Sequence, residues 1–260
     1  MATPKKKRIV SADTGKEVEA GSRRKVKEAA PVGNSVGLRI GAVVLWVVAL
    51  ALEIVALFIF TGKINLTFMP TLYQIIAALV LDLICVIIGS QLWKKANHIK
   101  PASEKNPFLF WLWNNMGLIV CAVAFIPFVV LALTNKEADK KTKAVASVVA
   151  IIALLIGGLA SYDFNPVSKE EQQAAMDAIQ DDVYWSPFGK VYHTHDDCSA
   201  LNQSDELTYG TVEQAIAANR TRLCSFCAKK DDITGVVTDD NDEVLEDSND
   251  SEDTNEDSEE

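Results

Sequence analysis

Several features of soluble enzymes are missing from this sequence. Its 260 residues contain no glycine-rich nucleotide loop, no arrangement typical of a catalytic triad and no metal-hydrolase motif. Charge is scarce between Ile40 and Tyr162, where four long apolar stretches are separated by short loops that contain Lys. This distribution excludes an ordinary soluble enzyme, a fibrous protein and a secreted disulfide scaffold.

Basic residues are also missing from the end of the chain. Residues 231–260 contain 15 of the 35 acidic residues and no Lys or Arg. The preceding residues contain 25 basic and 20 acidic side chains, a net charge of +5. The overall charge of −10 is therefore a property of the tail. We expect residues 231–260 to be a solvated, disordered segment, because their composition cannot form an apolar core.

Four segments are long and apolar enough to cross a membrane, which takes about 20 residues for a hydrocarbon core of about 30 Å. The predicted spans are residues 40–60, 71–93, 108–133 and 144–161. The connections between them are short, so we expect consecutive helices to be antiparallel neighbours.

The distribution of Lys and Arg predicts the orientation of these spans, because basic loops stay in the cytoplasm. Nine basic residues between Lys5 and Lys27 place the N-terminal arm inside, and a first loop with only Lys63 is expected outside. The third loop contains four Lys residues, yet four spans would place it outside. In an alternative arrangement, residues 108–133 re-enter without crossing, because Asn114-Asn115 and Pro127 interrupt them. We favour four spans with both ends cytoplasmic.

Two acidic residues lie inside the predicted spans, Glu53 in the first and Asp82 in the second. A carboxylate at this depth costs several kcal/mol, so it needs a reason. One interpretation is a proton or cation site between two helices, used for small-ion transport. The other, which we favour, is a protonated acid that joins helices by hydrogen bonds to Gln74, Gln91, Asn114 or a Trp.

The soluble segments flank the bundle. Residues 1–39 form a basic arm without apolar periodicity, which we expect to be disordered and attracted to anionic lipid headgroups. After the last span, Ser168-Lys-Glu-Glu171 matches a capping box and predicts a spacer helix over residues 168–181.

Residues 182–230 carry the clearest chemical signal. Short β-type runs around Pro187-Phe188-Gly189 predict a hairpin that ends at His193. Cys198 follows, and Cys224-Ser-Phe-Cys227 comes after a short predicted helix that begins at Thr211. Tetrahedral Zn²⁺ prefers imidazole and thiolate ligands, and this segment offers four of them: His193, Cys198, Cys224 and Cys227. His195 is the alternative to His193.

This segment resembles the small zinc-binding modules related to the metal-binding domain of the Ada methylphosphotriester repair protein. The resemblance lies in Gly189-Lys-Val-Tyr-His193, Cys198, Thr211-Val-Glu-Gln-Ala215 and Leu223-Cys-Ser-Phe-Cys227. It departs where Asn219 replaces the Gly that ends the helix and Leu223 replaces a Pro; Asn also suits a left-handed helix cap. The resemblance implies a zinc site at His193, Cys198, Cys224 and Cys227, and it covers about 45 residues. It implies no activity.

Two other interpretations of these cysteines stay open. Cys224 and Cys227 could form a thiol redox pair, although the βαβ context of a thioredoxin is missing, or the pattern could be a coincidence. Four protein ligands would leave no open position on the zinc, so we predict a structural site and no enzymatic activity. Nucleic-acid binding is disfavoured because the acidic tail opposes phosphate attraction.

The predicted fold class is thus an α-helical membrane bundle of four transmembrane helices, with a small α+β zinc-binding C-terminal module and disordered termini. The predicted function is the display of this module for interaction with a protein partner or for regulation at the membrane.

Overall fold

The computed structural model describes residues 7–18, 32–64, 67, 69–136 and 139–238. The chain folds into two compact units. Of the described residues, those in the ranges 32–172 and 216–221 form the helical unit, and those in the ranges 7–18, 173–215 and 222–238 form the second unit. Each unit is described by itself below.

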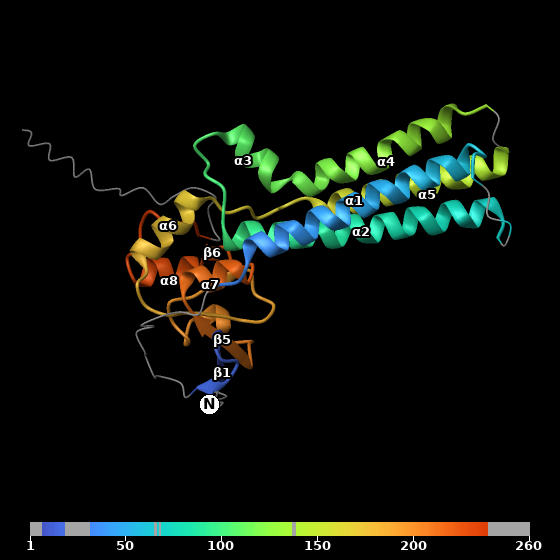
Figure 1. Cartoon of the computed structure of the whole chain (residues 1–260). Helices are drawn as coiled ribbons and strands as arrows, with labels where there is room; N and C mark the ends of the chain where they lie inside the picture. The colour runs from blue at the N-terminus through green and yellow to red at the C-terminus, as the bar shows by residue number, and fades with distance from the viewer. Residues whose placement is uncertain (1–6, 19–31, 65–66, 68, 137–138, 239–260) are drawn as a thin grey trace, which may run out of the picture. The chain divides into compact units, whose positions relative to one another are not determined.

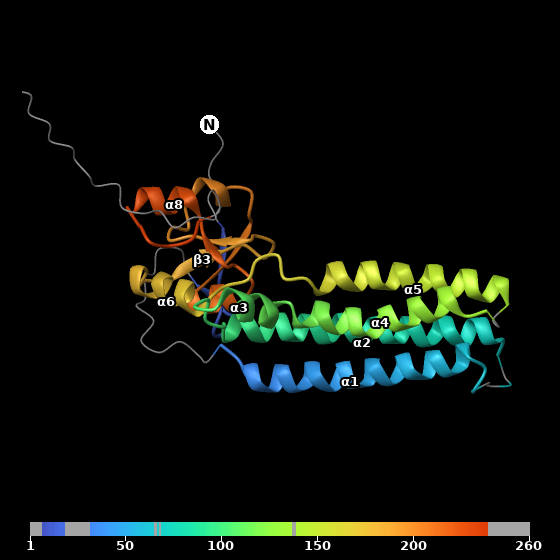
Figure 2. The ribbon, with the colours of Figure 1, turned by 90° about the horizontal axis from the view of Figure 1, so that it is seen from above.

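The helical unit is built from long antiparallel helices (Figures 1 and 2). These are α1 (Ser35–Phe60), α2 (Thr71–Ile99), α4 (Met116–Thr134) and α5 (Lys140–Ser161), with a short α3 (Pro107–Asn114) before α4. All four long helices are long and apolar enough to cross a membrane. Only about a third of each apolar segment is buried within the protein, so large apolar side chains face outward along every helix. The predicted set of four apolar helices is confirmed.

Small residues allow the helices to approach closely, as is common between membrane helices. A Cβ atom added at Gly89 of α2 would lie 2.6 Å from Nε1 of Trp46 on α1. A Cβ atom added at Gly157 of α5 would lie 2.8 Å from the Cys121 sulfur on α4. These two contacts fix the register of α1 against α2 and of α4 against α5, which are antiparallel neighbours as predicted.

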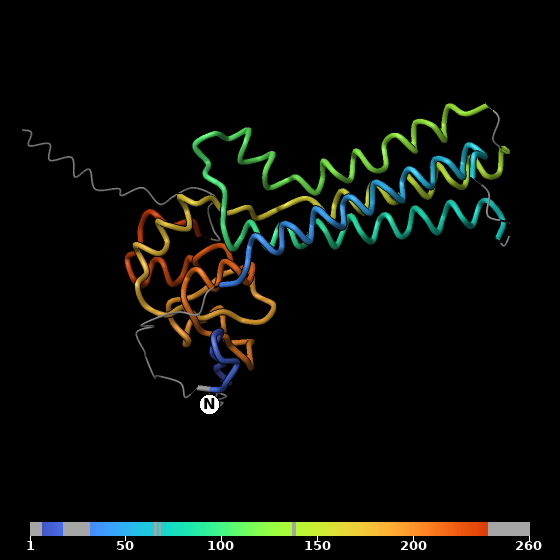
Figure 3. Tube along the Cα trace, viewed as in Figure 1, coloured from blue at the N-terminus to red at the C-terminus, as the bar shows by residue number. Residues whose placement is uncertain are grey.

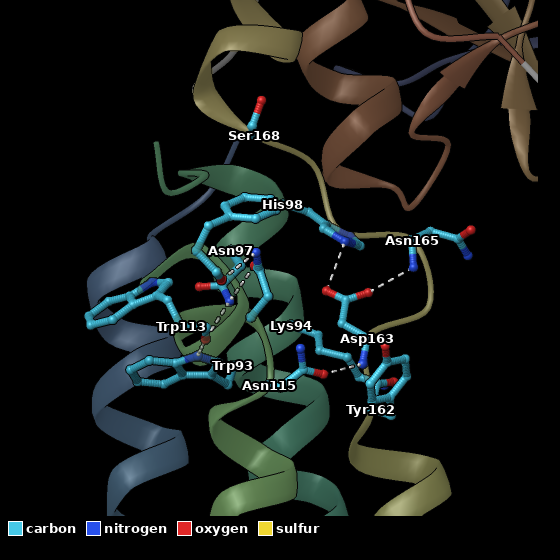
Figure 4. Close-up of polar contacts among 12 residues, drawn as sticks. Trp93, Lys94, Asn97, His98, Trp113, Asn115, Tyr162, Asp163, Asn165 and Ser168 are labelled. Atoms are coloured by element: carbon cyan, nitrogen blue, oxygen red, sulfur yellow. Dashed lines mark hydrogen bonds and ion pairs between the residues drawn. The ribbon is translucent and has the colours of Figure 1, made fainter. Parts of the chain in front are cut away.

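The third predicted span is divided at Asn115, where the chain turns between α3 and α4 (Figure 3). The break leaves the Trp113 carbonyl for donors from α2: Trp93 Nε1 donates to it at 2.8 Å and Asn97 Nδ2 at 3.3 Å. The Asn97 amide also donates to Asn114, at 3.2 Å (Figure 4). Pro127, in contrast, lies inside α4 without dividing it.

Polar contacts at this end of the helices also anchor the segment that follows α5 (Figure 4). The Lys94 ammonium donates to the carbonyl oxygens of Ala160 and Tyr162, at 2.8 and 3.3 Å. The backbone N–H of Asp163 donates to the Asn115 side chain at 3.3 Å, and its carboxylate lies 3.7 Å from His98 Nε2. The break in the third segment and the exit of α5 therefore share one network with α2.

The predicted helix start at Ser168 is confirmed. The Glu171 carboxylate accepts from the Ser168 N–H at 2.7 Å, and the Ser168 hydroxyl accepts from the Glu171 N–H at 2.9 Å. This reciprocal pair is a capping box. The resulting helix, α6 (Lys169–Ala178), is slightly shorter than predicted.

The second unit contains a four-stranded sheet in the order β2-β1-β5-β3. Its strands are β1 (Arg8–Ser11), β2 (Glu17–Val18), β3 (Val183–Trp185) and β5 (Glu206–Gly210). β5 pairs with β3 antiparallel and with β1 parallel, and the second pairing sets Ile9 beside Leu207. Residues from opposite ends of the chain thus share one sheet.

The prediction of a disordered arm over residues 1–39 is wrong for β1 and β2. Ile9 is buried in the unit, and the Arg8 guanidinium lies 3.5 Å from Glu17 and 3.4 Å from Glu206. The Lys7 ammonium donates to the Asp196 carbonyl at 2.9 Å. Lys7 and Arg8 belong to the arm that we expected to contact lipid headgroups, but their side chains contact residues of this unit. Residues 1–6 and 19–31 of the arm lie outside the described residues.

The prediction that disorder begins at residue 231 is also wrong by eight residues. Val236 and Thr238 are buried, and the Leu223 N–H donates to the Val237 carbonyl at 3.0 Å. The apolar residues between Ile233 and Val237 pack although acidic residues surround them in the sequence. The rest of the predicted tail, 239–260, lies outside the described residues.

Candidate metal centre

A short parallel strand pair brings distant residues together. β4 (Val191–Tyr192) pairs parallel with β6 (Arg222–Leu223), so the next residues, His193 and Cys224, lie side by side. The Cys224 N–H donates to the Tyr192 carbonyl at 2.9 Å, which continues the pairing by one step. Two residues that are far apart in sequence therefore reach one point through backbone hydrogen bonds.

The predicted hairpin positions His193. Tyr184 and His193 exchange two backbone hydrogen bonds of 2.7 Å, and the Gly189 N–H closes the turn on the Ser186 carbonyl at 3.3 Å. The hairpin prediction is therefore confirmed.

Helix ends position the cysteines. Cys224 is the N-cap residue of α8 (Ser225–Lys230), so Cys227 lies in the first turn of that helix. Cys198 precedes the 3₁₀ turn η1 (Ser199–Leu201) and accepts a backbone hydrogen bond from Leu201 at 2.9 Å.

These elements bring all four predicted ligands together. One ligand atom from each of His193, Cys198, Cys224 and Cys227 lies within 4.8 Å of every other, and all four residues are buried. The Cys198 and Cys224 sulfurs are 4.0 Å apart, and the Cys227 sulfur is 3.8 Å from His193 Nδ1. In a tetrahedral site with zinc–sulfur bonds of about 2.3 Å, two sulfurs are about 3.8 Å apart. The group could hold a metal ion.

The electrostatics of the group favour a thiolate. Hydrogen bonds from Cys224, His193 and Thr194 lower the pKa of the Cys227 thiol to about 3. The contact with Cys227 raises the pKa of Cys224, because the proton stays on the donor sulfur. Burial raises the pKa of Cys198. The thiolate is the form that binds metals, so the lowered pKa of Cys227 favours metal binding.

His195 does not join the group. Its Nε2 atom lies 2.6 Å from an Asp231 carboxylate oxygen, and the other oxygen of Asp231 accepts from the Thr194 hydroxyl at 2.5 Å. The structure therefore brings His193, and not the alternative His195, to the three cysteines.

The helix between the two halves of the predicted site begins as expected. The Thr211 hydroxyl accepts from the Gln214 N–H at 3.2 Å, ahead of α7 (Val212–Ala217), and the Gln214 side-chain oxygen accepts from the Thr211 N–H at 3.0 Å. Asn219 has a φ of 65°, so the prediction of a left-handed cap is confirmed.

Comparison with protein-family models, curated proteins and solved structures gives no match for this chain.

The two histidines provide a matched test of the ligand set. We expect His193→Ala to lower bound metal from about one ion per chain to nearly none, because three thiols alone leave the coordination incomplete. His195→Ala should keep the ion. Elemental analysis of both purified full-length variants measures this, and an ion lost from His195→Ala but kept by His193→Ala would contradict the assignment.

Proposed function

We propose that this chain is a multipass membrane protein that binds a structural zinc ion and displays the surrounding module to a protein partner. The observation that carries the proposal is the convergence of four buried ligand atoms within 4.8 Å. Four apolar helices long enough to span a bilayer support the membrane assignment.

The donor set favours zinc among the common metals. Three thiols and one imidazole form a soft to borderline set, whereas magnesium and calcium prefer oxygen ligands. Cys224 and Cys227 lie in a compact turn at the N-terminus of α8. In the proposed site, both sulfurs would bind one ion. The resemblance to the small zinc modules related to the Ada domain agrees with this order of ligands.

A structural role follows from the ligand count. Four protein ligands complete a tetrahedron, so no position remains for the water that catalytic zinc activates. The module is also small, and a metal supplies stability that a limited apolar core lacks. Binding is therefore the favoured activity. The side chain of Phe188 at the hairpin turn is 98% exposed, and aromatic residues are enriched in protein interfaces.

Two cysteine variants test the structural role. We expect Cys224→Ser to lose zinc and to raise amide hydrogen exchange across residues 183–238 by at least about tenfold, because a structural ion contributes several kcal/mol to folding. Cys85→Ser removes a thiol of α2 that is outside the ligand group and should change neither. Hydrogen exchange with mass spectrometry on the full chain in nanodiscs gives both readouts.

A wild-type chain without zinc, with a disulfide between Cys224 and Cys227, would contradict the proposal. It would instead favour the alternative of a thiol redox pair.

The orientation that we propose has both ends in the cytoplasm. The pairing of β1 with β5 supports it, because strands of one sheet must lie in one compartment and the chain between them then crosses an even number of times. The basic arm favours the cytoplasmic side. In the re-entrant alternative the two strands would be separated by the bilayer. In the proposed four-span arrangement, the Lys-rich loop after α4 faces outward despite its charge.

Single cysteines in the loops test this orientation. We expect a membrane-impermeant maleimide on intact cells to label Lys63→Cys and Lys136→Cys, in the first and third loops, because four spans from a cytoplasmic N-terminus place both loops outside. Lys105→Cys, in the second loop, should react only after permeabilisation. Labelling of Lys63→Cys without Lys136→Cys would indicate that α4 does not cross and would contradict four spans.

A further inference from the structure

Two carboxyl groups are buried inside the helical unit. Glu53 of α1 is 3% exposed and Asp82 of α2 is fully buried. None of their four oxygens accepts a hydrogen bond from a side chain among the described residues, and the Glu53 carboxylate interacts with the backbone of Phe128 on α4. A buried, unpaired carboxylate is costly in an apolar environment, so the charge of these groups must be neutralised by a bound proton or another cation.

The register of α1 against α2 sets the two acids opposite each other. Trp46 packs on Gly89, and the two helices are antiparallel. Glu53 lies seven residues after Trp46, and Asp82 lies seven residues before Gly89. Seven residues make almost two helical turns, so both acids return to the facing sides at one level. Their neighbours one turn away, Ala49 and Ala56 on α1 and Leu79 and Val86 on α2, belong to one buried core, which confirms the inward direction.

The three amide side chains that could have joined these acids donate hydrogen bonds elsewhere. Gln74 donates to the Met69 carbonyl at 2.5 Å, Gln91 to the Ala160 carbonyl at 2.8 Å and Asn114 to the Phe110 carbonyl at 3.1 Å. The interpretation of Glu53 and Asp82 as hydrogen-bonded links between helices therefore finds no support from these amides, and the predicted Trp partner is not seen either, since Trp46 Nε1 has no hydrogen-bond partner among the described residues.

The surroundings select the ligand. The core around the acids includes Phe125 and Phe128 of α4 and Ala150 of α5, which have no ionisable groups. The nearby ionisable side chains are the thiols of Cys85 on α2 and Cys121 on α4. Within the described part of the chain, the side chains grouped closely enough to hold a metal ion are those of the module, and neither acid is among them. A proton, in contrast to a metal ion, can bind to a single pair of carboxylates.

We propose that Glu53 and Asp82 form a proton-binding site inside the helix bundle. One proton taken from water bonds to an oxygen of one carboxylate, leaving a single negative charge on the pair. A second proton neutralises the pair. The site thus binds and releases protons as an interacting pair, within the apolar core between α1 and α2.

Infrared difference spectroscopy on the full chain in liposomes tests this site. The wild-type protonated-carboxyl band should titrate in two steps between about pH 4 and pH 10, because interacting acids release their protons separately. Glu53→Gln and Asp82→Asn should each leave one step with about half the amplitude. Ser147→Ala, which removes another buried and unpaired oxygen in α5, should match the wild type.

Three outcomes would overturn the proposal. A band that does not change over this range would mean that both acids stay protonated as structural groups. A wild-type titration equal to the sum of the two variants would mean that the acids do not interact. A band that shifts on adding sodium or potassium at constant pH would indicate a cation site in place of a proton site. The wild-type measurement decides the first and third outcomes even if a variant fails to fold.

Discussion

The parallel pairing of β4 with β6 is the interaction on which the candidate metal centre depends. It is only two residues long, yet it sets His193 beside Cys224 and so joins the hairpin to the start of α8. Cys227 lies in the first turn of α8, and Cys198 lies directly before η1, and both join the same ligand group. Such a short pairing contributes little stability alone. The proposed zinc ion would cross-link the same elements, so metal binding and strand pairing would stabilise each other.

A second long-range pairing, between β1 and β5, joins the two ends of the chain. Ile9 and Leu207 lie side by side although all the long helices separate them in sequence. The pairing also covers an edge of β5 that would otherwise offer unpaired backbone groups. Because one sheet occupies one compartment, this contact bears on membrane topology as directly as the distribution of Lys and Arg does. In the proposed membrane protein it would require an even number of crossings, and four apolar helices are compatible with that number.

Local patterns predicted the local structure well. The apolar runs, the capping box at Ser168 and the turn before His193 each depend on neighbouring residues, and all were found. The strands at Ile9 and the packing of Val236 were missed, because short apolar runs within charged segments have no periodicity of their own. Their partners are distant in sequence. The ligand residues could be predicted from their chemical types, but the parallel strands that unite them could not.

The coordination of the ion tests the central claim most directly. X-ray absorption at the zinc edge of the purified full-length protein should show three sulfur ligands at about 2.3 Å and one nitrogen at about 2.0 Å, with no water. That result would agree with a closed site built from His193, Cys198, Cys224 and Cys227. A shell with two sulfurs and oxygen ligands, or a protein that contains no zinc, would contradict the account.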